Sequence, residues 1–383
     1  MSVCPQPDAV LRDEAGTGTQ NGTGRWGPSS GTYPATAAAG PTLGQPPGAS
    51  LLSVSVVVVS KDEPRLGSTL DALEQQLSAE VGRGVAAGSE VLVVDASSGR
   101  LGSVRAAHAS VRWVDFQPPL DGGVTIAGQR NAALRASRGE VVVFVDSGCV
   151  PCEGWLGRLV APIARGDELV VSGRSTGAHN TFERAMPTGK MYYLDEAATI
   201  NLAVHRSVFE DVGGFDEGFA YGSDVDFTWR VVDAGLRIRY EPFASVEHDW
   251  GTFRRRMRRA REYGAARARL YRKHRRRIVR ALYEDPVPFV YPLWLLGLPI
   301  ALKRPLYLLL LVVPLWRARK HAGPGEVVLA HVFQGVGSLA EVASWVLPRS
   351  GGRTGSSGEV EAAKTGVTGN GRSAGILRTS ALG

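Results

Sequence analysis

Four aspartates stand at positions where a folded chain can present carboxylates to a ligand. Asp95 and Asp146 each end an apolar run, VLVVD and VVVFVD, and Asp224 and Asp226 share the glycine-flanked stretch GSDVDF. Any one of them could simply cap a helix, since an aspartate in a turn accepts free backbone N–H groups. Several carboxylates at one place repel each other unless a cation or a proton-bearing substrate compensates. Together they predict general acid–base or cation-dependent chemistry.

The elements that would position these acids alternate between strand and helix patterns. Apolar runs typical of buried strands lie at about 53–60, 90–95, 110–117 and 140–146, and leucines at helical spacing follow the first. Apolar strands that alternate with helices indicate an α/β fold, a Rossmann-like domain with a mostly parallel sheet. Ligands bind such sheets outside the carboxyl ends of the strands, where Asp95, Asp146 and the pair Asp62 and Glu63 would all lie.

Composition divides the chain into five parts. Residues 1–50 and 349–383 are rich in Gly, Ser, Thr, Pro and Ala without apolar periodicity, so we predict two disordered tails. Between them we expect the α/β domain at 51–250, a basic amphipathic helical segment at 251–285 and an apolar, membrane-associated region at 286–348.

Positive charge is concentrated in one segment. The formal net charge is +7, and residues 254–280 hold 13 arginines, one lysine and a single acid, Glu262. Apolar residues recur at near-helical spacing among them, which predicts one or two basic amphipathic helices.

Two apolar runs follow, Val287 to Leu302 and Pro305 to Trp316, divided by Lys303 and Arg304. A spanning helix needs about 20 apolar residues, so we expect a re-entrant hairpin or an interfacial anchor. A third stretch, Val327 to Leu347, is predicted to be an amphipathic helix. The arginines would then face anionic lipid. Nucleic acid is the competing partner, but it leaves the apolar runs unexplained. A solvated basic helix beside a buried hairpin is the third interpretation.

The cellular compartment is predicted from two further features. The first 30 residues lack the apolar core of a secretory signal, and three cysteines are too few for a disulfide framework. We therefore expect the protein at the cytoplasmic face of the cell membrane.

Several segments, in order, resemble glycosyltransferase family 2, the inverting enzymes with a GT-A fold. They are SVVVVSKDEPRLGSTLDAL, VLVVDASSG, GQRNAALRASRGEVVVFVDSGCVP, NLAVHRSVFEDVGGFDEGF and SDVDFTWRVVDAGLRIRYEPFASVEH, and the likeness covers residues 53 to about 275. It implies transfer of a sugar from a UDP- or GDP-sugar to a hydroxyl acceptor, with lipid-linked and cell-envelope molecules as the candidate acceptors. A divalent metal, Mg²⁺ or Mn²⁺, would assist.

The resemblance also implies roles for single residues. Asp95 matches the acid that contacts the nucleotide base, and Ser60, Asp62 and Glu63 belong to the loop beneath the ribose. Arg130 and Asn131 match a pair near the nucleotide. Asp146 is similar to the first acid of the D-x-D motif, which contacts the ribose and the metal. Asp224 resembles the general base, with Asp226 as a possible acceptor-side residue or an alternative base.

The chain departs from the family pattern at Gly148, where the second acid of D-x-D is expected. Three explanations are open: Asp146 and His248 hold the metal, arginines replace it at the diphosphate, or the site is degenerate. We favour the first, because Mg²⁺ needs few protein ligands. The acid that usually precedes the base is also changed, to Ser223. The competing function is therefore a degenerate scaffold that binds membrane or nucleic acid through its arginine-rich helix.

Overall fold

The structure is a computed structural model that describes residues 51–81, 85–86, 88–119, 123–177, 192–319 and 323–347. The predicted disorder of the tails 1–50 and 349–383 concerns residues outside these ranges.

The N-terminal half of the central sheet is parallel. Its strands are β1 (Val54–Ser60), β2 (Glu90–Asp95), β3 (Arg112–Asp115) and β4 (Val141–Asp146), in the order β3-β2-β1-β4. The helices between them are α2 (Leu66–Glu80), α3 (Gly102–Ala107) and α4 (Ile126–Ala136). Each predicted apolar run forms a strand, and the predicted Rossmann-like α/β architecture is confirmed.

The second half makes the sheet mixed. It contains β5 (Cys149–Pro151), β6 (Val170–Thr176), β7 (Tyr192–Leu194), β8 (Asn201–His205) and β9 (Ile238–His248). β8 runs antiparallel to β4 and β6, β9 is parallel to β6, and β5 and β7 are antiparallel to β9. Apolar runs do not encode strand direction, which is why these antiparallel pairs were not predicted.

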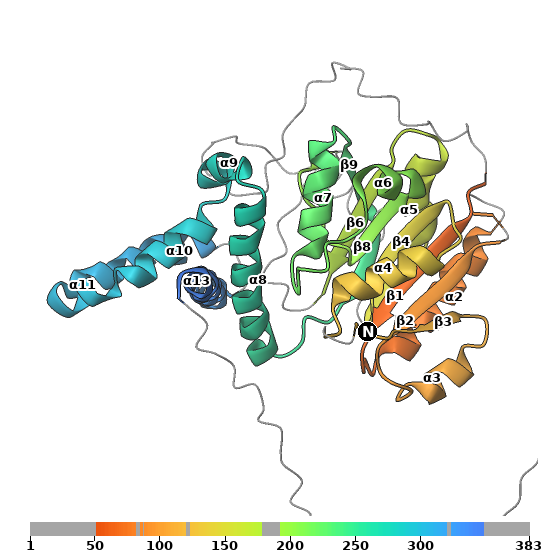
Figure 1. Ribbon diagram of the computed structural model, residues 1–383, viewed down its shortest axis with the longest axis horizontal. Coiled ribbons are helices and arrows are strands. Elements are labelled where there is room, and N and C mark those ends of the chain that lie inside the picture. Colours follow the sequence, from red (N-terminus) through yellow and green to blue (C-terminus); the bar gives the residue numbers. More distant parts are fainter. Residues whose placement is uncertain are drawn as a thin grey trace, which may run out of the picture.

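Helices cover both faces of the sheet (Figure 1). They include α5 (Trp155–Ala164), α6 (Arg206–Val212) and α7 (Ser223–Asp233). Alternate residues of one strand point to opposite faces. In β4, Val143 and Val145 join the core that contains Trp155 of α5, whereas Val142 and Phe144 join the core beneath α4, α6 and α7. This burial on both faces explains why the runs are apolar throughout.

The C-terminal helices form a separate layer beside the sheet. They are α8 (Phe253–Lys273), α9 (Arg277–Glu284), α10 (Val287–Leu296), α11 (Leu298–Lys303), the 3₁₀ segment η2 (Pro305–Leu311), α12 (Val312–Ala318) and α13 (Pro324–Val346). The helices predicted in the basic segment are thus present as α8 and α9, and the weak apolar stretch 327–347 is helical. Figure 1 shows α8 standing between the sheet domain and α10 with α11, which extend away from it.

Candidate active site

Strand register brings Asp95 and Asp146 to the same edge of the sheet. β1 lies between β2 and β4, with Ser60 beside Asp95 and Val59 beside Asp146. Strands are about 4.8 Å apart, so the two aspartates lie roughly 10 Å from each other across the end of β1. Asp95 is buried, whereas the Asp146 side chain is 40% exposed. A ligand at this edge can therefore contact both carboxylates.

The loop after β1 is held against the loop after β2. The Ser97 hydroxyl donates to Asp95 Oδ1 at 2.5 Å and accepts the Asp62 N–H at 2.7 Å. These bonds use Oδ1 and leave Asp95 Oδ2 for a ligand. Arg100 pairs with the Asp62 carboxylate at 2.6 Å and holds the pKa of that exposed group below its usual range. The Asp62 carboxylate therefore serves this loop pairing.

Gln129 is a residue that the sequence reasoning missed. It is buried in α4, and its amide donates to the carbonyls of Ser60 at 2.9 Å and Val94 at 3.0 Å. The amide thus ties together the ends of β1 and β2 that carry the predicted nucleotide loop. Only its place beside the predicted Arg130 could have drawn attention to it.

Arg130 lies between Asp146 and the start of α7. Its side chain is buried, with Nη2 3.5 Å from Asp146 Oδ1 and Nη1 donating to the Ser223 hydroxyl at 3.4 Å. The guanidinium also lies over the Phe215 ring. A fixed cation therefore stands beside Asp146, which suits a site for an anionic ligand.

Asn131 turns to the other side of α4 and holds the loop that precedes α7. Its amide donates to the Phe215 carbonyl at 2.8 Å and to Glu217 at 2.7 Å, and it accepts the Phe215 N–H at 2.9 Å. A Cβ at Gly214 would lie 2.7 Å from Asn131 Oδ1, so only glycine fits there. The structure thus gives Asn131 a positioning role where the resemblance implied a nucleotide contact.

We expect Asn131→Ala to lower the free energy of unfolding by about 1–3 kcal/mol, because the Phe215 backbone groups would lose their partner. Chemical denaturation would measure this change. The nucleotide affinity of the folded variant should stay close to that of the wild type. A variant with native stability but weakened nucleotide binding would return Asn131 to the nucleotide.

The turn after Asp146 gives a structural reason for glycine at position 148. Gly148 has φ +88° and its N–H donates to Thr69 Oγ1 at 3.0 Å. A Cβ built there would lie 3.8 Å from the Glu63 carboxyl group. An aspartate at 148 would therefore adopt a strained backbone and face a like charge. Glu63, from the β1 loop, already supplies a carboxylate on that side.

His248 is brought to the same edge by the pairing of β5 with β9, where it lies opposite Cys149. It is buried, with Nδ1 3.4 Å from Cys149 Sγ and its ring edge-on to Trp250. Burial lowers the His248 pKa and raises that of the Cys149 thiol, so both are neutral near pH 7. The Asp146 charge acts in the opposite direction on the His248 pKa, and Cys149, which contacts the His248 ring, lies three residues after Asp146.

Asp224 lies in the first turn of α7, where the helix dipole favours a negative charge. Its Oδ1 accepts the Val225 N–H at 2.9 Å. Burial raises the pKa of Tyr263 in α8 to about 12, and the negative charges of Asp224 and Asp146 add to the rise. The geometric link between the two acids is Arg130, which contacts Asp146 and donates to Ser223, the residue that precedes Asp224.

Arg259 of α8 is a second residue that sequence reasoning did not single out. It lies one helical turn before Tyr263, is half-buried, and its charge lowers the pKa values of both His248 and Tyr263. Within the part of the chain that the structure describes, no ion-pair partner neutralises it. The charge of Arg259 thus reaches His248 and Tyr263 from the helical layer.

Residues 55–216 match the family model described as Glycosyl transferase family 2. The matched segment, less than half of the chain, belongs to this family. It is 35% identical over 145 residues to a pre-mycofactocin glycosyltransferase of Mycobacterium tuberculosis, a match that covers 33% of this chain and 30% of the relative. It is 31% identical over 121 residues to the glycosyltransferase AglE of Haloferax volcanii, covering 29% of this chain and 40% of the relative. The matches thus span well under half of either relative.

One solved structure shares the fold over most of both chains. The mannosyltransferase PcManGT from Pyrobaculum calidifontis, in complex with GDP-Man and Mn²⁺, superposes with a TM-score of 0.53 over 77% of this chain and 88% of that chain, at 19% identity. The fold of residues 54–248 is accordingly a GT-A fold, as the resemblance implied.

Asp226, which was predicted as a possible acceptor-side residue, lies between α7 and α8. It is fully buried and pairs with Arg230 at 3.0 Å, Lys273 at 2.7 Å and His274 at 2.8 Å. Burial alone would raise its pKa, but the bonds from Lys273 and His274 outweigh this and lower it. The expectation of an acceptor-side role is therefore corrected: Asp226 joins α7 to α8, and the alternative of Asp226 as base is disfavoured.

The donor atoms around Asp146 can be compared with what a hard divalent cation needs. No group of three or more His, Cys, Asp or Glu side chains is arranged for a metal within the described residues. Mg²⁺ and Mn²⁺ on a diphosphate need only one or two protein ligands, with phosphate oxygens and water completing the shell. Asp146 and the neutral His248 fit that requirement. Binding through His248 Nε2 would require Nδ1 to hold the proton and donate to Cys149 Sγ.

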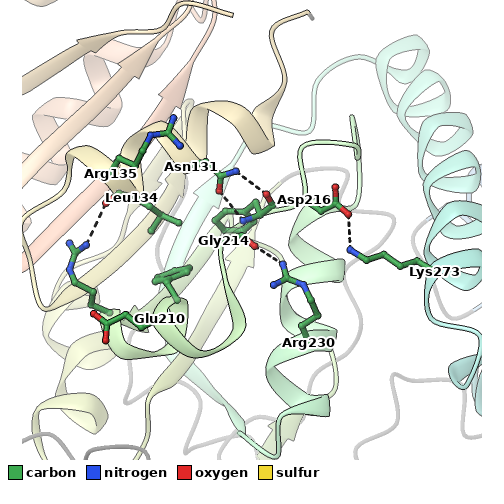
Figure 2. Close-up of a pocket in the computed structure, with 11 residues that line it drawn as sticks. Asn131, Leu134, Arg135, Glu210, Gly214, Asp216, Arg230 and Lys273 are labelled. Atoms are coloured by element: carbon green, nitrogen blue, oxygen red, sulfur yellow. Dashed lines mark hydrogen bonds and ion pairs between the residues drawn. The ribbon is translucent and has the colours of Figure 1, made fainter. Parts of the chain in front are cut away.

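A cavity of about 630 Å³ is lined by residues of α4, α6, α7 and α8, among them Asn131, Phe209 and Lys273 (Figure 2). Among its lining residues, Arg230 bonds the Gly214 carbonyl and Lys273 bonds Asp216. None of Asp95, Asp146, Asp224 and His248 lines it. Because strand register brings Asp95 and Asp146 together at the strand edge, and Arg130 links Asp146 to the start of α7, we place the candidate active site there.

Proposed function

We propose that this protein transfers a sugar from a nucleotide-diphosphate sugar to a hydroxyl group with inversion at the anomeric carbon. The observation that carries the proposal is the link that Arg130 makes between Asp146, which with Asp95 flanks the end of β1, and Ser223, which precedes Asp224 in α7. Two acids are then available for the donor and a third for the acceptor.

The donor side is assigned to the first half of the sheet. Asp95 would accept hydrogen bonds from the nucleotide base through Oδ2, and the loop from Ser60 to Glu63 would lie beneath the ribose. Asp146 would contact the ribose and the cation at the diphosphate, with Arg130 beside it at 3.5 Å. GDP-Man in PcManGT and the family match support a nucleotide-sugar donor, either UDP- or GDP-linked.

The acceptor side is assigned to Asp224. Inverting transfer is an in-line displacement, so a base must take the hydroxyl proton on the face opposite the departing diphosphate. Asp224 is partly exposed in the first turn of α7. Unlike Asp226, it has no ion-pair partner among the described residues, so it can accept this proton.

The leaving diphosphate needs a positive charge. A divalent cation bound there would neutralise the charge that develops on the departing oxygens. Asp146 and His248 would hold it, while Arg130 and Arg259 add fixed positive charge. If no cation binds, Arg259 is the residue we expect to replace it. The scaffold alternative has Gly148 in its favour, and the retention of Asp95, Asp146 and Asp224 opposes it.

Calorimetric titration with UDP and GDP, with and without Mn²⁺, tests this assignment. We expect Mn²⁺ to strengthen binding of one nucleotide by at least tenfold, and His248→Ala to remove that gain, because the variant loses a ligand. Arg259→Ala should then weaken binding with and without the metal alike.

Other outcomes would contradict parts of the proposal. If nucleotide affinity does not change with Mn²⁺ but is lost in Arg259→Ala, arginine and not a metal ion neutralises the diphosphate. Absence of binding by either nucleotide would favour the degenerate scaffold.

A further inference from the structure

Large apolar side chains are exposed over one part of this molecule. Before residue 279, the exposed ones in the described chain are scattered: Leu51, Val81, Ile126, Val150 and Phe253. From α10 to α12 they are nearly continuous: Val290, Leu293, Leu296, Ile300, Leu302, Leu306, Leu308, Leu309, Leu310, Val312, Val313, Leu315 and Trp316. Leu302 is 90% exposed and Leu306 74%. A patch of this kind marks a surface that another apolar phase covers.

This patch belongs to an ordered hairpin. We call residues 287–318, from α10 to α12, the apolar hairpin. The Tyr307 hydroxyl donates to the Trp294 carbonyl at 2.9 Å, and the two rings stack at 6.3 Å. At its base Tyr291 and Ala318 pack on Val327 and Val328 of α13. The apolar hairpin is thus fixed at one end and projects from the sheet domain at the other (Figure 1).

The helices of the apolar hairpin are short for a bilayer crossing. α10 has 10 residues and α11, which follows Gly297 in nearly the same direction (Figure 1), has 6, so that together they make about 25 Å of helix. The hydrocarbon core of a bilayer is about 30 Å thick. Residues 286–302 and 305–316 carry no charge, and Lys303 with Arg304 separates them. Such a pair can reach the headgroups while the apolar side chains lie at the acyl boundary.

Among the described residues, α13 is long and apolar enough to cross a membrane. Its contacts oppose that placement. Glu326 near its start pairs with Arg256 of α8 at 2.6 Å, and Glu341 near its end pairs with Arg269 at 2.7 Å. The Ser338 hydroxyl donates to the Gly264 carbonyl between them. α13 therefore runs along α8, and crossing the bilayer would draw the arginines of α8 into it at several kcal/mol each.

Basic side chains adjoin the apolar surface. Arg275 and Arg276, at the turn from α8 to α9, are exposed and have no ion-pair partner within the described ranges. Val279 and Tyr283 of α9 are exposed immediately after them, at 65% and 85%. Arginine near an anionic leaflet gains about 1 kcal/mol per residue. A nucleic acid would match these charges but would leave the leucines of the apolar hairpin in water.

We propose that the apolar hairpin inserts into one leaflet of an anionic membrane, lies at its headgroup boundary, and anchors the enzyme without α13 crossing the bilayer. Membrane binding by this surface depends on its exposed apolar side chains and its charge, so it is expected whether or not sugar transfer is detected.

Flotation with phosphatidylglycerol–phosphatidylcholine vesicles tests the proposal on the full chain, purified in detergent that is then removed. We expect the wild type to float with the vesicles. In the double variant Leu306→Glu/Leu309→Glu the fraction of protein bound to vesicles should be at least tenfold smaller than in the wild type. The matched control, Leu51→Glu/Val81→Glu, changes exposed apolar residues outside the surface and should float like the wild type. Equal melting temperatures of the two variants would show that both are folded.

Depth is tested with a nitroxide at position 306, introduced as cysteine with Cys4, Cys149 and Cys152 replaced by serine. We expect relaxation from lipid-soluble oxygen to exceed that from an aqueous nickel chelate, and a nitroxide at position 336 of α13 not to report the bilayer centre. A wild type that stays with the soluble fraction, or forms a dimer that buries position 306 in the presence of vesicles, would overturn the proposal. Displacement of the vesicles by RNA would overturn it in favour of nucleic acid.

Discussion

Replacing Asp224 with asparagine should reduce the rate of sugar transfer by about 10²- to 10⁴-fold, the usual contribution of a general base. Nucleotide affinity should stay within about twofold of the wild type, because the general base does not bind the nucleotide. The amide keeps the shape of the side chain at the start of α7 but cannot accept the acceptor's proton. The measurement is release of nucleoside diphosphate from the sugar nucleotide that titration selects, with a membrane lipid extract as the source of acceptor.

Asp95→Ala is the matched comparison for this variant. It removes a carboxylate from the same edge but on the donor side, so it should weaken nucleotide binding, where Asp224→Asn does not. Equal loss of nucleotide affinity in the two variants would sink the division into a donor acid and an acceptor base. Unchanged turnover in Asp224→Asn would remove the base assignment outright.

The second large effect is on stability. Asp226→Ala should lower the free energy of unfolding by about 3–5 kcal/mol, because it leaves the positive charges of Arg230 and Lys273 without the buried carboxylate that compensates them. Thermal or denaturant unfolding of the full chain would measure the loss. Asp216→Ala is the control: Asp216 also pairs with Lys273, at 2.7 Å, but is 37% exposed, so its removal should cost about 1 kcal/mol or less.

The same carboxylate makes stability depend on pH. The folded pKa of Asp226 lies below the value of about 3.9 expected in the unfolded chain. Its contribution is therefore complete above about pH 5 and is lost as the pH falls toward the lowered folded pKa. Wild type and Asp226→Ala should accordingly converge in stability at low pH. Parallel curves down to pH 2 would show that folding does not lower the pKa of Asp226.

Comparison of the two variants also separates the acids of the stretch SDVD. The residues are two positions apart in one helical turn, yet Asp224 is partly exposed beside Tyr263 whereas Asp226 is enclosed by side chains of α7 and α8. A loss of activity without a loss of stability is expected for Asp224, and the converse for Asp226. The spacing in the sequence could not distinguish these roles, since it does not say which face α8 covers.

Local pattern was sufficient for the parts of this protein that depend on nearest neighbours. The apolar runs determined the strands that end at Asp95 and Asp146, because buried strands must be apolar on both faces. Helical spacing determined α2, α8 and α9. The motif order was enough to recognise the family of residues 55–216, glycosyltransferase family 2.

Contacts between distant segments were decided only by the tertiary structure. The antiparallel strands β5, β7 and β8 depend on how connections return to the sheet, which apolar composition does not record. The amide of Asn131 is used by a loop more than 80 residues away, and the charge of Asp226 by a helix nearly 50 residues away. The charge of Arg259 reaches His248 because α8 packs beside the strand edge. Such pairings depend on three-dimensional distance, whereas a sequence read alone supplies the residue types and their local spacing.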